Sequence, residues 1–169
     1  MPAPDGFAEF VTGRSRALLR IAWLLTGDSG KAEDLLQTAL ARVWPRWERI
    51  ASGGNPEAYV RRVMITTYVS WWRRRWRFET PGEPPETVDR ADLAGDSATR
   101  DAVRRALAGL SRQQRAVVVL RYVEDLSIAE TAHVLGCSAG TVKVQAGRAL
   151  AALRTNPHLR LFVTEEVGS

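Results

Sequence analysis

One stretch near the C-terminal end, residues 126–154, restricts the fold of this chain more than any other. It carries the start and stop signals of two helices in close succession. Ser127 and Glu130 form a capping box, which begins a helix by satisfying backbone N–H groups. Gly136 is the residue type that ends a helix in the left-handed conformation, and Ser138 is a good N-cap for the next helix. This order predicts a helix-turn-helix, whose second helix lies in the major groove of DNA, or else an ordinary pair of helices in an all-helical domain.

Helical spacing divides the two predicted helices into inner and outer faces. The residues expected to face the core are Ala129, Ala132 and Leu135 in the first helix and Val142, Ala146, Ala149 and Leu153 in the second. The second helix then presents Thr141, Lys143, Val144, Gly147 and Arg148 outward. Lys143 and Arg148 can reach phosphates or guanine acceptors, and Val144 can pack on a thymine methyl group. Gly147 has no side chain to keep the backbone away from a groove.

The N-terminal half has the apolar periodicity of further helices, which predicts an all-α fold. We expect one helix over residues 7–25 and a second over residues 29–47, with Pro45 bending or shortening its end. Residues 51–55 are predicted to form a loop. Asn55 as N-cap and Pro56 as the first helical residue predict the start of a third helix.

The third helix combines arginine and tryptophan in an unusual way. Tyr59, Val60, Val63, Met64, Thr67 and Trp71 are placed to face a core. The remaining set consists of cationic and aromatic residues: Arg61, Arg62, Trp72, Arg73, Arg74, Trp76 and Arg77. Interleaved arginine and tryptophan suit a surface that holds phosphates and stacks on bases. The alternative is that the tryptophans are buried and the arginines form a solvated face.

Residues 79–100 differ in composition from both flanking parts. They are rich in proline and acidic residues and nearly lack large apolar ones, which predicts a flexible acidic linker. We therefore expect two small helical domains, residues 1–78 and 101–155, joined by this linker and followed by a short tail, residues 156–169. A second capping box, Ser111 with Gln114, predicts a helix before the helix-turn-helix.

Charge and composition limit the function classes. The net charge of +5 suits a polyanionic partner such as a nucleic acid. No apolar run reaches the length of a membrane span and no signal peptide is evident, so we expect a cytoplasmic protein without membrane insertion. Cys137 is expected to be a small buried residue, and His133 a surface residue. The scattered His and Cys residues predict neither a metal site nor a cofactor.

Three motifs in this order resemble the extracytoplasmic-function sigma factors of the sigma-70 family. The segment AEDLLQTALARVW, from Ala32, resembles region 2.2, and PEAYVRRVMITTYVSWWRRR, from Pro56, resembles regions 2.3 and 2.4. The segment from Leu110 to Lys143, ending in Gly-Thr-Val-Lys, resembles region 4. The chain departs from the family pattern at Thr66, where asparagine is usual, and at Val144, where serine is usual. The resemblance covers residues 7–154, most of the chain.

The resemblance implies a non-enzymatic function and three sets of contact residues. Such proteins bind the clamp and the flap of core RNA polymerase, direct it to promoter DNA and help to open the duplex, and an anti-sigma factor often masks them. Contacts to the polymerase are expected from Asp34, Leu35, Gln37 and Arg42. Contacts to the −10 element are expected from Asn55, Arg61, Arg62, Trp72, Arg73, Arg74, Trp76 and Arg77. Contacts to the −35 element are expected from Thr141, Lys143, Val144, Gly147 and Arg148.

Two other functions compete with this one. A stand-alone transcriptional regulator that dimerises through the helix-turn-helix domain would explain residues 111–154 but not the third helix. A protein that binds RNA or single-stranded DNA through the third helix would leave the helix-turn-helix unexplained. An enzyme is disfavoured because His133 and His158 have no catalytic partners nearby in the sequence.

Overall fold

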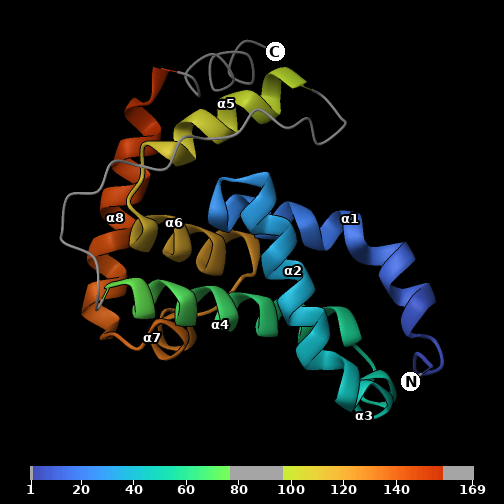
Figure 1. The fold of residues 1–169 in the computed structure, drawn as a ribbon. Helices are drawn as coiled ribbons and strands as arrows, with labels where there is room; N and C mark the ends of the chain where they lie inside the picture. The colour runs from blue at the N-terminus through green and yellow to red at the C-terminus, as the bar shows by residue number, and fades with distance from the viewer. Residues whose placement is uncertain (1, 77–96, 158–169) are drawn as a thin grey trace, which may run out of the picture. The chain divides into compact units, whose positions relative to one another are not determined.

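The computed structural model of the chain describes residues 2–76 and 97–157, without the side chains of residues 74–76 and 97. All regular structure in these ranges is helical (Figure 1), which confirms the predicted all-α class. The chain divides into two compact units, residues 1–84 and 85–169. Within the described ranges, no helix combines the length and the apolar content that a membrane span requires.

The first unit is built around its second helix. It contains α1 (Phe7–Thr26), α2 (Ser29–Val43), the 3₁₀ turn η1 (Trp44–Arg46), α3 (Trp47–Ser52) and α4 (Pro56–Trp76), and α2 packs against both α1 and α4 (Figure 1). Side chains that are almost completely buried fill the space between these helices: Leu18, Leu25, Leu35, Val43, Val60, Met64 and Ile65. Tyr59, which was expected to face this core, is 41% exposed, so that prediction is wrong.

Local chemistry explains most helix boundaries in this unit. Gly27, in the left-handed conformation with φ 71°, ends α1, and the Asp28 carboxylate accepts the Lys31 backbone N–H at 3.0 Å to begin α2. The helix predicted over residues 29–47 ends at Val43, where Pro45 lies in the 3₁₀ turn. A further short helix follows and includes residues 51 and 52, so the predicted loop is reduced to residues 53–55.

The second unit contains α5 (Ser97–Ala108), α6 (Arg112–Val118), the π-helical turn η2 (Val119–Val123), α7 (Ile128–Leu135) and α8 (Ala139–Thr155). The last helix packs against α6 and α7. Because α5 begins at Ser97, the last residues of the predicted linker 79–100 are helical. Residues 79–96 of that linker lie outside the described residues, as does the tail from residue 158.

The helix predicted to begin at the Ser111 capping box changes its hydrogen-bonding pattern after Val118. The Glu124 backbone N–H donates to the Val119 carbonyl at 2.9 Å, five residues back, so the chain is π-helical here. Asp125 follows with φ 54°, the only non-glycine residue with positive φ in the described ranges. This wider turn leads the chain to the start of α7.

Candidate functional site

The helix-turn-helix has the caps that its sequence predicts. The Ser127 hydroxyl accepts the Glu130 N–H at 3.0 Å, and the Glu130 carboxylate accepts the Ser127 N–H at 3.4 Å. Gly136 ends α7 with φ 67°. The Ser138 hydroxyl then accepts the Thr141 N–H at 3.1 Å and begins α8. Two helices therefore meet across residues 136–138, a turn of three residues.

The faces of α7 and α8 largely follow the predicted spacing. Val142 and Ala149 are completely buried, and Ala146 and Leu153 are half-buried. On the opposite side Lys143, Val144, Gly147 and Arg148 are exposed and Thr141 is half-buried. Ala129 was expected in the buried stripe of α7 but is exposed, and Thr131 is buried in its place. Cys137, predicted to be buried, is half-buried, and His133 is exposed as predicted.

The outer face of α8 therefore presents two cationic side chains, Lys143 and Arg148, and one exposed apolar side chain, Val144. Val144 is 50% exposed, so its methyl groups are accessible to a partner. A Cβ atom added at Gly147 would meet nothing within 4 Å, so the fold itself does not require glycine there. This combination of positive charge, an exposed methyl-bearing side chain and bare backbone suits the edge of a DNA major groove.

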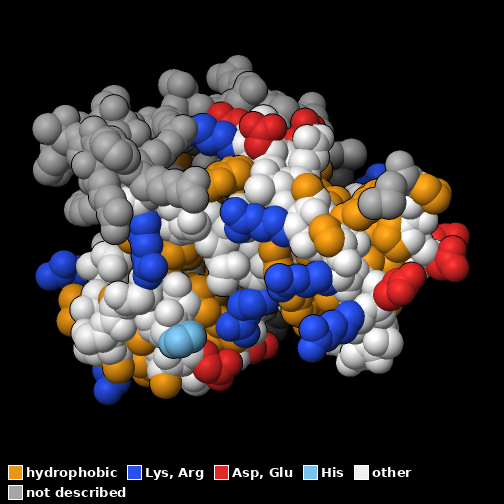
Figure 2. All heavy atoms as spheres, turned by 60° about the horizontal axis from the view of Figure 1, so that its bottom comes forward, with side chains coloured by type: hydrophobic (Ala, Val, Ile, Leu, Met, Phe, Trp, Pro, Cys, Tyr) orange, Lys and Arg blue, Asp and Glu red, His pale blue; other side chains and the backbone are white. Residues whose placement is uncertain are grey.

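The second basic surface lies on α4. Arg62 and Arg73 are exposed, while Trp71 and Trp72 are both half-buried. Trp71 was expected in the core and Trp72 on the DNA side, but burial does not distinguish the two side chains. The side chains of Arg74 and Trp76, and all of Arg77, lie outside the described residues. Figure 2 shows Lys and Arg side chains lying among hydrophobic and other side chains on one face of the molecule.

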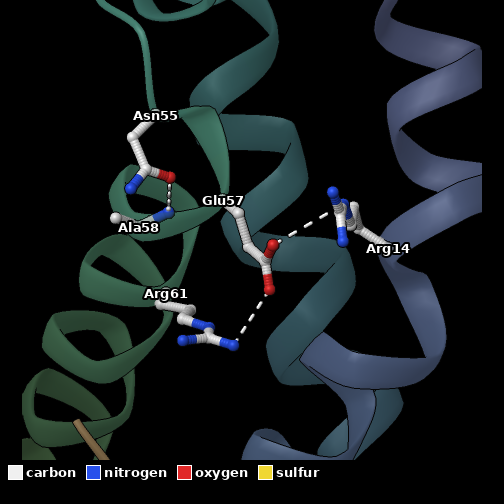
Figure 3. A network of polar contacts seen from close by, with 5 residues as sticks. All are labelled: Arg14, Asn55, Glu57, Ala58 and Arg61. Carbon is white, nitrogen blue, oxygen red and sulfur yellow. Dashed lines mark hydrogen bonds and ion pairs between the residues drawn. The ribbon is translucent and has the colours of Figure 1, made fainter.

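Polar contacts fix the beginning of α4 (Figure 3). The Asn55 side chain accepts the Ala58 N–H at 3.1 Å, which confirms the predicted N-cap. The Glu57 carboxylate contacts Arg61, one turn later, at 2.9 Å and Arg14 of α1 at 3.5 Å. Arg61 was predicted to contact phosphate, and in the structure its guanidinium is held by Glu57. The spacing of Glu57 and Arg61 could have indicated their contact, whereas nothing in the sequence pointed to Arg14.

The third set of predicted residues lies on α2. Asp34, Gln37 and Arg42 are exposed. Leu35, predicted as an apolar contact for a partner, is 0% exposed and belongs to the core, so its side chain does not reach the surface of this helix. Arg42 Nη1 donates to Thr67 Oγ1 of α4 at 2.9 Å, and Thr67 is itself completely buried. No three His, Cys, Asp or Glu side chains among the described residues are arranged to hold a metal ion.

Both units match known protein families. Residues 10–78 match the family model for sigma-70 region 2, and residues 100–153 match the model for sigma-70 region 4. The first match contains α2 and α4, and the second contains the helix-turn-helix.

Similar proteins span nearly the same length. The RNA polymerase sigma-E factor of Streptomyces coelicolor is 48% identical over 148 residues, covering 88% of this chain and 84% of the relative. The ECF RNA polymerase sigma factor SigL of Mycobacterium tuberculosis is 34% identical over 145 residues, covering 81% of this chain and 80% of the relative. A solved structure of the Bartonella quintana sigma factor RpoE, in complex with the anti-sigma factor NepR, matches with a TM-score of 0.57 and 26% identity, covering 89% of this chain and 96% of that one.

Proposed function

The chain belongs to the sigma-70 family as an extracytoplasmic-function RNA polymerase sigma factor, and we propose which of its surfaces contact the polymerase and which contact promoter DNA. The protein binds core RNA polymerase, directs it to promoters through the −10 and −35 elements and promotes opening of the DNA. This function is regulatory and not enzymatic, and it takes place in the cytoplasm, where the polymerase and the chromosome are.

The exposed face of α8 is the observation that carries the proposal. Lys143 and Arg148 flank Val144 and Gly147 on the helix that a helix-turn-helix inserts into the major groove. We assign Lys143 and Arg148 to phosphates or guanine acceptors and Val144 to a thymine methyl group. Thr141, whose hydroxyl lies 2.9 Å from that of the N-cap Ser138, completes the surface that reads the −35 element.

The basic face of α4 is the proposed −10 surface. Arg62 and Arg73 are exposed and can hold the phosphates of the displaced strand. Trp72 is partly accessible and can stack on an unpaired base, which contributes about 1–3 kcal/mol per base. Asn55 and the short loop before it are placed at the start of this helix, where a flipped base can be held. Arg61 supports this surface through Glu57 more than it contacts DNA.

Core RNA polymerase is proposed to dock on the exposed residues of α2. Asp34 and Gln37 lie about one turn apart and have no role in the buried core. Arg42 completes this face and at the same time ties α2 to α4 through Thr67. Exposed polar residues are typical of an interface rim, and Leu35 anchors the same helix in the core.

The competing function, a stand-alone helix-turn-helix regulator, requires only the second unit. It gives no role to the exposed arginines of α4 or to the first unit, which matches sigma-70 region 2. A solved relative is bound to an anti-sigma factor, and we propose a protein of that class as a further partner of this chain.

Co-purification tests the proposal directly. The tagged full-length chain, mixed with core RNA polymerase, should elute with it as a one-to-one complex, and only this complex should bind promoter duplex at physiological salt. If the chain bound the duplex as a dimer and ignored core polymerase, the regulator function would replace the one proposed here.

A further inference from the structure

We propose that α1, together with the residues before it, acts as a brace that fixes both ends of the loop 53–55, with Trp47 and Glu57 as the positioning residues. The brace would set the position of the loop and so decide how well the protein distinguishes bases of the −10 element. This inference rests on the proposed function of that loop and adds a role for α1, which makes no proposed contact with DNA or polymerase.

The first end of the loop is anchored through Trp47, the first residue of α3. Its indole N–H donates to the Asp5 carbonyl at 3.0 Å, and its side chain is only 3% exposed. Phe7 and Phe10 pack against the Trp47 ring at centroid distances of 5.3 and 4.9 Å. Because α3 has only six residues, its own hydrogen bonds cannot hold it in place. Its position therefore depends on tertiary contacts, which are the aromatic contact with α1, the buried Ile50 and packing against α4.

The peptide before α1 is shaped for the same contact. Gly6 has φ 82°, a conformation that side chains other than glycine rarely adopt, and it leads directly into Phe7. A Cβ atom at Gly6 would lie 3.9 Å from the Trp47 indole nitrogen. The turn thus brings the Asp5 carbonyl to the Trp47 N–H while it starts α1.

The second end of the loop is anchored through Glu57, in the first turn of α4. Its carboxylate contacts Arg14 of α1 at 3.5 Å and Arg61 at 2.9 Å (Figure 3). The Glu57 side chain is 23% exposed and the Arg14 side chain 57%. A pair this exposed adds little to the stability of the domain, but it does restrict where α4 begins relative to α1.

The loop itself has little means of holding a fixed shape. It contains Gly53 and Gly54, and Gly54 has φ 95° with nothing within 4 Å of a potential Cβ atom. Glycine gives the backbone the greatest conformational freedom of any residue. Only Asn55, at its end, is held by a side-chain hydrogen bond, the N-cap to Ala58. A base held by such a loop needs both of the loop's ends fixed, because discrimination depends on a closely defined geometry.

The test compares base discrimination by holoenzyme assembled from core RNA polymerase and the full chain. The probe is a single-stranded oligonucleotide with the non-template strand of a −10 element, taken from a promoter mapped by sequencing transcript 5′ ends. Its affinity is compared with that of oligonucleotides carrying one abasic site at each position in turn. Trp47→Phe removes the N–H but keeps an aromatic ring, and Glu57→Gln removes the charge but keeps the size. Trp47→Phe should reduce the preference for the intact base about fivefold, as expected for one lost hydrogen bond, and Glu57→Gln about twofold, as expected for an exposed ion pair; both should leave affinity for core polymerase unchanged.

Trp23→Phe is the matched control. Trp23 lies on α1 itself, but its buried indole nitrogen makes no hydrogen bond within the described residues. This variant should keep the full preference. An unchanged preference in Trp47→Phe and Glu57→Gln, or an equal loss in Trp23→Phe, would overturn the brace. If Trp47→Phe fails to fold, the surface variant Glu57→Gln decides the question. If the unaltered holoenzyme itself shows no preference at any position, the proposed −10 function fails, and the brace fails with it.

Discussion

Replacing Gly147 with alanine should stabilise the protein and weaken its binding to the −35 element at the same time. Gly147 lies in the interior of α8, is exposed, and would give a Cβ atom nothing to meet within 4 Å. Glycine inside a helix is less stable than alanine by roughly 0.5–1 kcal/mol. The fold therefore accepts a residue that costs it stability, and we attribute this to the close approach of DNA.

The expected changes have opposite signs. For a domain of 60–100 residues, a gain of 1 kcal/mol raises the melting temperature by roughly 4–8 °C, so Gly147→Ala should raise that of the second unit by about 2–8 °C. A methyl group between the helix backbone and the groove should remove about one base contact, which lowers the affinity of holoenzyme for a −35 duplex roughly tenfold.

Two measurements on the same variant check this prediction. Circular dichroism gives the melting temperature, and fluorescence anisotropy with a labelled −35 duplex gives the affinity. Gly13→Ala is the control, because Gly13 is likewise exposed inside a helix, α1, with nothing within 4 Å of its potential Cβ. It should gain stability without losing affinity. Gly147→Ala with unchanged or tighter DNA binding would refute the reasoning.

Three further variants, one of them a double substitution, test the surfaces of α2, α8 and α4. Replacing Asp34 and Gln37 with alanine should weaken core polymerase binding in a titration without lowering the melting temperature, whereas Glu48→Ala, on α3, should not; equal affinities would remove the α2 assignment. Lys143→Ala should weaken binding to all DNA sequences alike and reduce by about one the slope of the logarithm of the binding constant against the logarithm of the salt concentration. A changed base preference would instead show that Lys143 contacts a base. Trp72→Ala should slow opening, followed with a fluorescent base analogue in the −10 element, and a pre-melted template should restore the rate; without rescue, Trp72 serves the fold.

Helix boundaries governed by local chemistry could be predicted from sequence. The capping boxes at Ser127 and Ser111, the left-handed Gly136 and the N-cap at Asn55 all formed as expected. Each depends on residues within three or four positions of one another, so the sequence contains all the information. The outward face of α8 followed for the same reason, because helical spacing decides which side chains can be buried together.

Features that depend on distant residues could not be predicted. Leu35 was expected both in the apolar core stripe of its helix and among the polymerase contacts, and the structure places it in the core. The hydrogen bond from Trp47 to the Asp5 carbonyl joins residues 42 positions apart and has no sequence signal. The π-helical turn at Val119–Val123 was missed because such turns are rare and lie within apolar runs that are typical of an α-helix.

Run-off transcription tests the central claim most directly. Core RNA polymerase, a promoter template mapped from transcript 5′ ends and the full-length chain are combined, and transcripts are compared with reactions that lack the chain. We expect a transcript of one defined start that requires both the chain and the intact −10 and −35 elements. Core polymerase that gives the same products with and without the chain, under conditions where the chain is folded, would contradict it.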